Sequence, residues 1–363
     1  MLPIERSVES KFNRILLSKL KTLAFAIGLS ALTGGHALGS PSLEPELKIY
    51  TSRHYASDQA LNDQFTKDTG VVVRSVSMKD ASALVARVVA EKNNPQADLV
   101  ITADTGNLLR MAEAGALEPL GSPMVRDAVP EDFRDPGDLW NGIAMRVRVI
   151  AYSKSRVNPA DIKTIESLAL PQFKGKVLVR SSSHVYNQSL AATLLAVSGP
   201  EKLRQWARGI AANLARKPQG GDTDQLKAIG AGEGDIAIVN SYYVARLMDS
   251  EDPKERELAS KIGVVFPNQG AGERGAHVNV SGVGLLRGSK AKAAARAYVQ
   301  FLLSPSSQQL FADASKEYPM RADVPLSKTL QSWGRPQLDS KALRQIAIHS
   351  PAAVGILDEV GWR

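Results

Sequence analysis

Four of the eight tyrosines in this 363-residue chain lie at three places where a predicted strand is followed at once by a predicted helix: Tyr55, Tyr186, and the adjacent pair Tyr242 and Tyr243. Open α/β sheets bind their ligands in crevices outside the carboxyl ends of the strands. We therefore expect these phenols to face a common cleft. The pair leaves a second interpretation open. Neighbours on a helix point about 100° apart, so one ring could pack in the core while the other lies on the surface.

Clustered phenols are suited to a hard, highly charged metal ion. A free phenol has a pKa of about 10 and is neutral at neutral pH, but a strong cation stabilises the phenolate, as metals do for bound thiols and water. Calcium or magnesium would call for carboxylate clusters, and the three junctions offer only Asp58. Zinc would favour His and Cys, and the chain has no Cys. Because tyrosinate is a known iron ligand, the residue types favour ferric iron (Fe³⁺).

Three further residues could complete such a site. His54 stands next to Tyr55 and could either bind the metal or orient the loop. Three or four phenolates on Fe³⁺ leave a net charge of about zero or −1, which a guanidinium would stabilise. Arg146 lies in a long extended run, and Arg246 lies one turn after Tyr242. We expect either arginine to donate to a phenolate oxygen, and we interpret His184 as a loop residue.

Composition argues against other functions. The formal charge is +8, but the basic residues are scattered and no nucleic-acid-binding motif is present, so we expect no nucleic-acid partner. No G-x-S-x-G or H-E-x-x-H motif occurs, and the five histidines form no clear triad. We therefore predict a protein that is not an enzyme.

Residues 1–39 are typical of a signal peptide. Five basic residues precede a short apolar run, and small residues follow near Gly39, where we predict cleavage. A retained N-terminal anchor is the alternative. No Cys follows the apolar run, so a lipoprotein anchor is not expected. The chain is therefore predicted to be exported to the periplasm.

Strand-like and helix-like segments alternate in two sets, which predicts an α/β fold with mainly parallel sheets. Two long extended runs, 142–153 and 276–286, join the sets. The arrangement indicates a two-lobed periplasmic-binding-protein fold, with hinge crossover strands and a ligand cleft between the lobes. Lobe 1 would comprise 44–145 plus about 278–328, and lobe 2 would comprise 146–277 plus about 329–363. Near the end of the chain we expect separate helices at 340–349 and 351–360.

The sequence resembles a known family, the periplasmic ferric-iron-binding proteins of bacterial ABC transporters, and in particular its tyrosine-rich branch. The resemblance covers nearly all of the chain after about Leu47. It is carried by the segments "LKIYTSRHY", "ADLVITAD", "AEAGALEPL", "MRVRVIAYS", "FKGKVLVR", "DIAIVNSYYVARL" and "HVNVSGVGLL". The Tyr-Tyr pair is the most specific feature, whereas "EAGAL" is common among solute-binding proteins.

The resemblance implies roles for the candidate residues. Tyr242 and Tyr243 match the paired iron ligands, and Tyr55 and Tyr186 match two further ligands of the tyrosine-rich branch. His54 matches a histidine that binds iron in some members and not in others. Arg146 and Arg246 match arginines that hydrogen-bond to the ligands.

One departure separates this chain from the better-known branch, whose members use a carboxylate just after the third strand plus a bound phosphate. The matching position here is Ala103, next to Asp104. This puts a synergistic anion in doubt and favours Tyr186 as the replacement ligand. By resemblance we expect a monomer that delivers iron to an inner-membrane ABC permease. The alternative is the same fold binding an oxyanion or a small organic solute.

Overall fold

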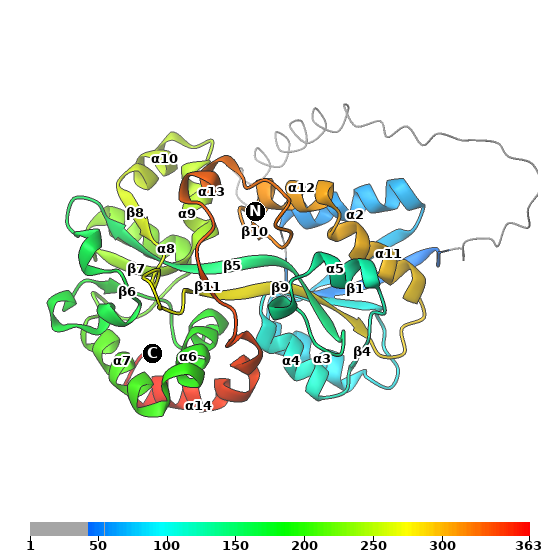
Figure 1. Cartoon of the computed structure of the whole chain (residues 1–363), viewed down its shortest axis with the longest axis horizontal. Helices are drawn as coiled ribbons and strands as arrows, with labels where there is room; N and C mark the ends of the chain where they lie inside the picture. Colours follow the sequence, from blue (N-terminus) through cyan, green and yellow to red (C-terminus); the bar gives the residue numbers. More distant parts are fainter. Residues whose placement is uncertain (1–42, 54) are drawn as a thin grey trace, which may run out of the picture. The chain divides into compact units, whose positions relative to one another are not determined.

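The computed structural model in Figure 1 describes residues 43–53 and 55–363. The predicted signal peptide, 1–39, and His54 lie outside the described residues. In the part of the chain that is described, no helix is long and apolar enough to cross a membrane.

The strands form one continuous mixed sheet, whose main path runs in the order β2-β1-β3-β9-β5-β7-β6. The short strands β4 and β11 pair with β9, and β8 and β10 pair with β5. The strands are β1 Glu46–Thr51, β2 Val72–Ser77, β3 Leu99–Thr102, β4 Leu117–Glu118, β5 Trp140–Ser153, β6 Val177–Leu178, β7 Ile236–Asn240, β8 Ile262–Val265, β9 Ala276–Leu286, β10 Tyr318–Pro319 and β11 Leu338–Asp339.

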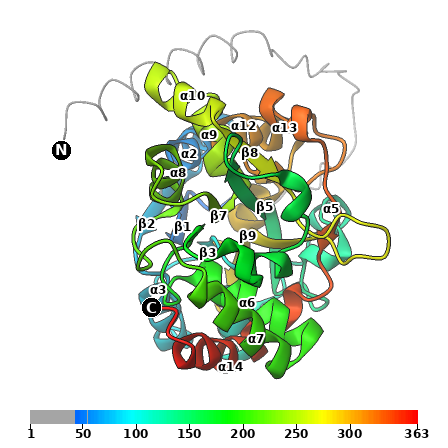
Figure 2. The same ribbon diagram turned by 90° about the vertical axis from the view of Figure 1, so that its left-hand side faces the viewer.

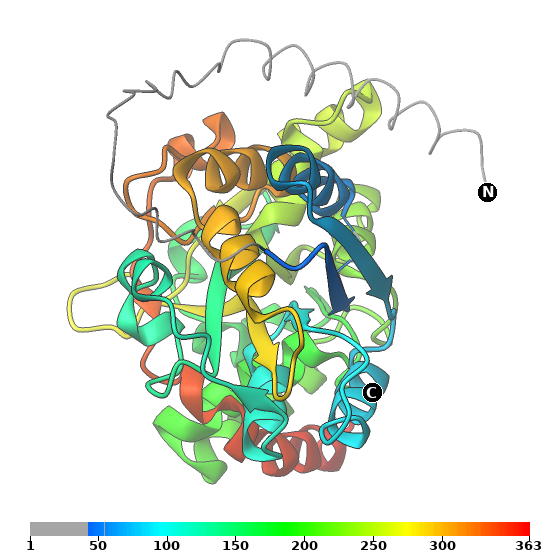
Figure 3. The same ribbon diagram turned by 90° about the vertical axis from the view of Figure 1, so that its right-hand side faces the viewer.

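Helices lie on both faces of this sheet. Figure 2 shows α8, α9 and α10 on one side of the strands and α6, α7 and α14 on the other, and Figure 3 shows the same layering from the opposite end. The helices are α2 Ala56–Thr69, α3 Ala81–Ala90, α4 Thr105–Glu113, α5 Pro123–Ala128, α6 Val185–Ser198, α7 Pro200–Ala212, α8 Asp222–Ala231, α9 Ser241–Met248, α10 Pro253–Ser260, α11 Lys292–Leu302, α12 Pro305–Ser315, α13 Lys328–Trp333 and α14 Ile346–Glu359.

The two long extended runs are the central strands β5 and β9. The first part of β5, Trp140–Val147, pairs with β9, and the second part, 148–153, pairs with β7 and β8. Nearly every residue of both strands is buried, as expected for strands covered by helices on both faces. The strand β5 therefore passes from one group of strands to the other, as a crossover strand would. The residue boundaries of the two lobes stay a prediction.

The expectation of mainly parallel sheets is wrong. Strand β1 pairs in parallel with β2 and β3, and β6 pairs in parallel with β7. The long strands β5 and β9 instead run antiparallel to each other, and they pair antiparallel with β7 and β3 respectively. Strand–helix alternation predicts parallel pairing only within each βαβ unit, and the long strands lie outside those units.

The expectation of separate helices at 340–349 and 351–360 is also wrong. Residues 346–359 form the single helix α14, with Pro351 inside it, and residues 343–345 form a short 3₁₀ turn. Pro351 lacks the N–H that would bond to the carbonyl one turn earlier. The neighbouring Ser350 hydroxyl donates to the Ile346 carbonyl at 2.6 Å. Buried residues on both sides of the proline, such as Ile346 and Leu357, hold the helix against the core.

Candidate functional site

The hydroxyls of Tyr55, Tyr186 and Tyr242 converge on one side chain, Arg146 of strand β5. Its Nη2 donates to the Tyr55 hydroxyl at 3.1 Å, to the Tyr186 hydroxyl at 2.6 Å, and to the Tyr242 hydroxyl. The Tyr186 and Tyr242 hydroxyls are 3.3 Å apart. Arg146 is only 1% exposed. Three segments that are distant in the sequence thus place phenol oxygens around one buried cationic donor.

Each of these tyrosines is positioned by a strand that ends and a helix that begins. Tyr55 is the residue before α2, and Tyr186 and Tyr242 lie in the first turns of α6 and α9. His184, interpreted above as a loop residue, also helps to position Tyr186. It caps α6 by accepting a hydrogen bond from the Tyr186 N–H on Nδ1 at 3.2 Å. Its ring contacts the Tyr186 ring edge-on at 4.3 Å between centroids.

The two adjacent tyrosines lie side by side. Tyr242 is fully buried and Tyr243 is half-buried, and their ring centroids are 4.3 Å apart with 31° between the ring planes. Burial raises the pKa of Tyr242 well above its usual value, although Arg146 acts in the opposite direction. Burial likewise raises the pKa of Tyr243. Both groups are therefore neutral phenols at neutral pH until a stronger cation than a guanidinium approaches.

Arg246 also reaches the site, but it contacts the faces of the rings. Its guanidinium carbon lies 4.5 Å from the ring centre of Tyr55 and 5.1 Å from that of Tyr242. Its Nε donates to the Ser315 carbonyl at 3.1 Å, at the end of helix α12. The two predicted arginines thus differ in their contacts: Arg146 hydrogen-bonds to the hydroxyls and Arg246 lies over the rings.

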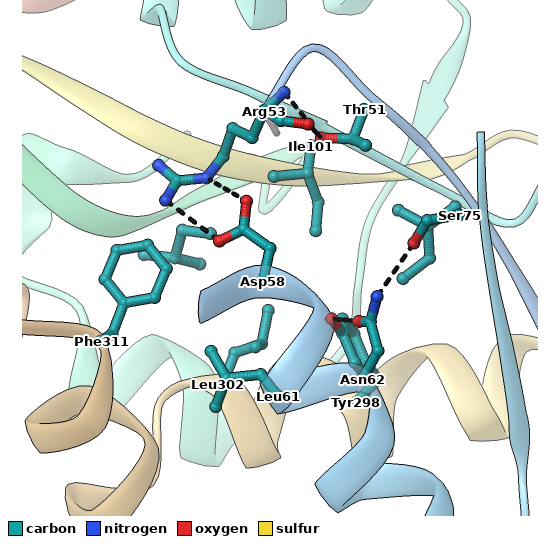
Figure 4. Close-up of a pocket in the computed structure, with 12 residues that line it drawn as sticks. Thr51, Arg53, Asp58, Leu61, Asn62, Ser75, Ile101, Tyr298, Leu302 and Phe311 are labelled. Carbon is teal, nitrogen blue, oxygen red and sulfur yellow. Dashed lines mark hydrogen bonds and ion pairs between the residues drawn. The ribbon is translucent and has the colours of Figure 1, made fainter. Parts of the chain in front are cut away.

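A buried ion-pair network lies behind Arg146, and sequence reasoning missed it. The Nε of Arg146 is 3.0 Å from Oε1 of Glu317, and Arg53 donates from Nη1 to the other carboxylate oxygen at 3.1 Å. Arg53 also pairs with Asp58 at 3.3 Å, which Figure 4 shows together with the adjoining cavity of about 30 Å³. Glu317 is fully buried. No motif marked it, because it lies more than 160 residues from Arg146 along the chain.

A second network holds the other arginine of the β5 run. Arg148 pairs with Asp222 at 3.3 Å and donates to the Asn187 side chain at 2.8 Å. Asp222 also pairs with Arg180 and accepts from the Asn240 N–H at 2.8 Å. The carboxylate of Asp222 therefore ties together the segments that carry Tyr186 and Tyr242. A small cavity of about 10 Å³, the size of one water, adjoins this region and is lined by Ala103, Arg146, Arg148, Tyr186, Asn240, His277 and Asn279.

The position that lacks a carboxylate presents a backbone oxygen instead. The carbonyl of Ala103 accepts from Arg146 Nη1 at 2.8 Å. The next side chain, Asp104, is buried and accepts from Ser189 of α6 at 2.5 Å and from Asn279. Across residues 43–53 and 55–363, no group of three or more His, Cys, Asp or Glu side chains is placed to hold a metal ion.

Comparison with known proteins gives a consistent set of relatives. The sequence model described as "Bacterial extracellular solute-binding protein" matches residues 60–336. "Iron uptake protein A2" of Synechocystis is 40% identical over 354 residues, which cover 96% of this chain and 100% of that protein.

Two solved structures are similar over nearly their whole length. The Trichodesmium protein IdiA (FutA), in complex with iron and citrate, is 41% identical, with a TM-score of 0.82 over 88% of this chain and 100% of that chain. Apo FutA2 from Synechocystis is 42% identical, with a TM-score of 0.81 over 88% and 99% of the two chains. These matches confirm the predicted fold class.

Proposed function

This chain belongs to the bacterial extracellular solute-binding protein family, and from that premise we propose that it binds ferric iron and delivers it to an ABC transporter. The ligands we propose are the phenolates of Tyr55, Tyr186, Tyr242 and Tyr243. The observation that carries this proposal is the convergence of three phenol oxygens on Nη2 of Arg146. The relatives named for iron uptake, and the related structure that holds iron and citrate, support the same cargo.

The geometry suits a trivalent cation. The phenol oxygens accept hydrogen bonds from a cationic donor, Arg146, through their lone pairs. A metal ion bound among the phenols would be coordinated by lone pairs of the same oxygens. Each phenol loses its proton on binding, and Fe³⁺ supplies the charge density needed to ionise groups whose pKa burial has raised. Arg146 then stabilises the phenolates by donating hydrogen bonds to them, as outer residues commonly do for metal ligands. His54 is a further candidate ligand or a residue that orients the loop of Tyr55.

Several finer properties belong to the same proposal. We propose that the predicted signal peptide, residues 1–39, directs export of the protein to the periplasm. We also propose that the protein acts as a monomer without catalysis and that its protein partner is the transporter's permease. The proposed ligands come from both predicted lobes, 44–145 plus about 278–328 and 146–277 plus about 329–363. Iron binding would therefore close the cleft about β5 and β9.

The test is whether iron and colour depend on the paired tyrosines. Ferric phenolate complexes absorb visible light through ligand-to-metal charge transfer, so protein purified from iron-containing medium should be coloured and should hold about one iron per chain. A Tyr242→Phe/Tyr243→Phe variant should lose both the band and the metal. Metal-free, colourless wild-type protein that carries a bound anion would contradict the proposal. So would a double variant that keeps the band and the affinity.

A further inference from the structure

Glu317 is a fully buried carboxylate that pairs with Arg146 behind the tyrosine cluster. Helix α12 ends at Ser315, and Lys316 takes a left-handed backbone conformation with φ of 61°. The next residue is Glu317, whose carboxylate meets Arg146 Nε at 3.0 Å and Arg53 Nη1 at 3.1 Å. The Ser281 hydroxyl also donates to it, at 3.4 Å. Glu317 thus stands between two guanidinium groups.

The groups of this cluster are charged at neutral pH. Burial raises the pKa of Glu317, but Arg53, Arg146 and Arg246 outweigh it and hold the pKa below its usual value. Arg53 and Arg146 are each 3% exposed or less. Arg53 has a second carboxylate, Asp58, and its guanidinium carbon lies 4.5 Å from the ring centre of Phe311 (Figure 4). Among the described residues, Arg146 pairs with one carboxylate, Glu317, and its Nη2 donates to phenol oxygens.

We propose that Glu317 is a built-in counter-anion: it balances the buried arginines in the iron-free protein, and its negative charge opposes the binding of iron. This inference rests on the proposed function. Fe³⁺ with four phenolates carries a net charge of about −1, whereas the four phenols they replace are neutral. Iron binding therefore adds negative charge on the far side of Arg146 from Glu317. The fixed carboxylate weakens the complex and so favours release of the cargo.

A role limited to holding Arg146 in place predicts the opposite effect. Arg146 keeps two other anchors, the Ala103 carbonyl at 2.8 Å and the phenol oxygens. A glutamine at position 317 has nearly the same shape as glutamate and can still accept a hydrogen bond. We therefore expect the guanidinium to stay in place in a Glu317→Gln variant, so that the loss of negative charge dominates.

The experiment compares two variants that break the same ion pair but change the charge in opposite directions. Ferric affinity is measured at one pH by competition with nitrilotriacetate, and folding of the iron-free protein is followed by thermal unfolding. Glu317→Gln should bind iron about tenfold more tightly, which corresponds to about 1.4 kcal/mol. Arg53→Gln should bind it more weakly. Asp235→Asn is the control, because it removes a carboxylate paired with Arg156 just before the start of β7, at the opposite end of that strand from Tyr242.

Each outcome has a defined meaning. Tighter binding by Glu317→Gln, with Asp235→Asn unchanged, supports the inference. Equal or weaker binding by Glu317→Gln overturns it and leaves Glu317 as a structural anchor. If Glu317→Gln does not fold, Arg53→Gln/Glu317→Gln removes one charge of each sign, and it must bind iron more tightly than Arg53→Gln alone. Failure of the wild-type protein to bind iron would refute the proposed function, which is a separate result.

Discussion

Replacing Tyr242 by phenylalanine separates the role of its hydroxyl in the fold from its role in metal binding. In the iron-free protein the hydroxyl accepts a hydrogen bond from Arg146 and lies 3.3 Å from the Tyr186 hydroxyl. Arg146 keeps Tyr55, Tyr186 and the Ala103 carbonyl as partners after the change. The loss should therefore cost only about 1 kcal/mol of the free energy of unfolding, the usual net value of one hydrogen bond.

The expected effect on iron binding is much larger. Removing a residue that supports a metal ligand commonly lowers affinity about 10–100-fold, so removing a charged ligand should lower it by more than about 100-fold. The pH dependence should change as well. Burial raises the pKa of Tyr242, so this phenol holds its proton at pH 6–8 and must release it to bind iron. With four phenolates the logarithm of the affinity should rise by about four per pH unit, and with three by about three.

The assay is a ferric competition titration with nitrilotriacetate between pH 6.5 and 7.5, corrected for protonation of the chelator. Denaturant unfolding of the iron-free proteins gives the stability. Tyr298→Phe is the matched control, because Tyr298 is equally buried and its hydroxyl donates to neutral Asn62. It should lose similar stability and keep the slope and the affinity. A Tyr242→Phe protein that keeps wild-type affinity and slope would refute the assignment of Tyr242 as a ligand.

Further predictions concern closure, acid stability and the contact between α4 and α6. Small-angle scattering should show a smaller radius of gyration with iron than without it, and an unchanged distance distribution would contradict hinge closure. Burial, with the nearby Arg148 and Arg274, lowers the pKa of His277 to about 3. The neutral, buried His277 therefore stabilises the folded protein less and less as pH falls from about 6.5 towards 3. Between pH 7 and 5, the free energy of unfolding measured with urea should fall by about 2 kcal/mol less in His277→Gln than in wild type. Ser189→Ala removes a hydrogen bond to buried Asp104 and should cost about 1–3 kcal/mol in the same assay.

The parts of the fold that could be predicted from the sequence are those set by local patterns. The alternation of strand-like and helix-like segments is one example: β1 at Glu46–Thr51 is followed by α2, which is terminated by Gly70 in the left-handed conformation. The strand–helix junctions that carry Tyr55, Tyr186 and Tyr242 are likewise local. The strand-end rule predicted a common cleft for these phenols, whereas Arg146 as their shared donor was only one of two alternatives. The assignment of these residues as metal ligands stays a prediction.

What could not be predicted depends on contacts between distant segments. Glu317 lies in the segment "SKEYP", which has no period or motif that separates it from any other surface turn. Its burial results from the way α12 ends against Arg53 and Arg146. Asp222 is similar: at the start of α8 it has the sequence context of an ordinary helix-start acid, yet it is fully buried against two arginines. The sequence shows that these acidic and basic residues are present, but it does not show which of them pair with each other.

These unpredicted carboxylates explain how the site can hold so many arginines before any metal arrives. Neutral phenols cannot balance a buried guanidinium, and a buried charge without a partner is very costly. Glu317 balances Arg146, and Asp222 balances Arg148, so the phenols are free to stay protonated. Several phenols will ionise together only around an ion whose positive charge stabilises the phenolates enough to overcome both their raised pKa values and the repulsion from the nearby carboxylates. The same balance of charges thus favours trivalent over divalent metal ions, because a divalent ion with four phenolates would leave a net charge of about −2 in a buried site.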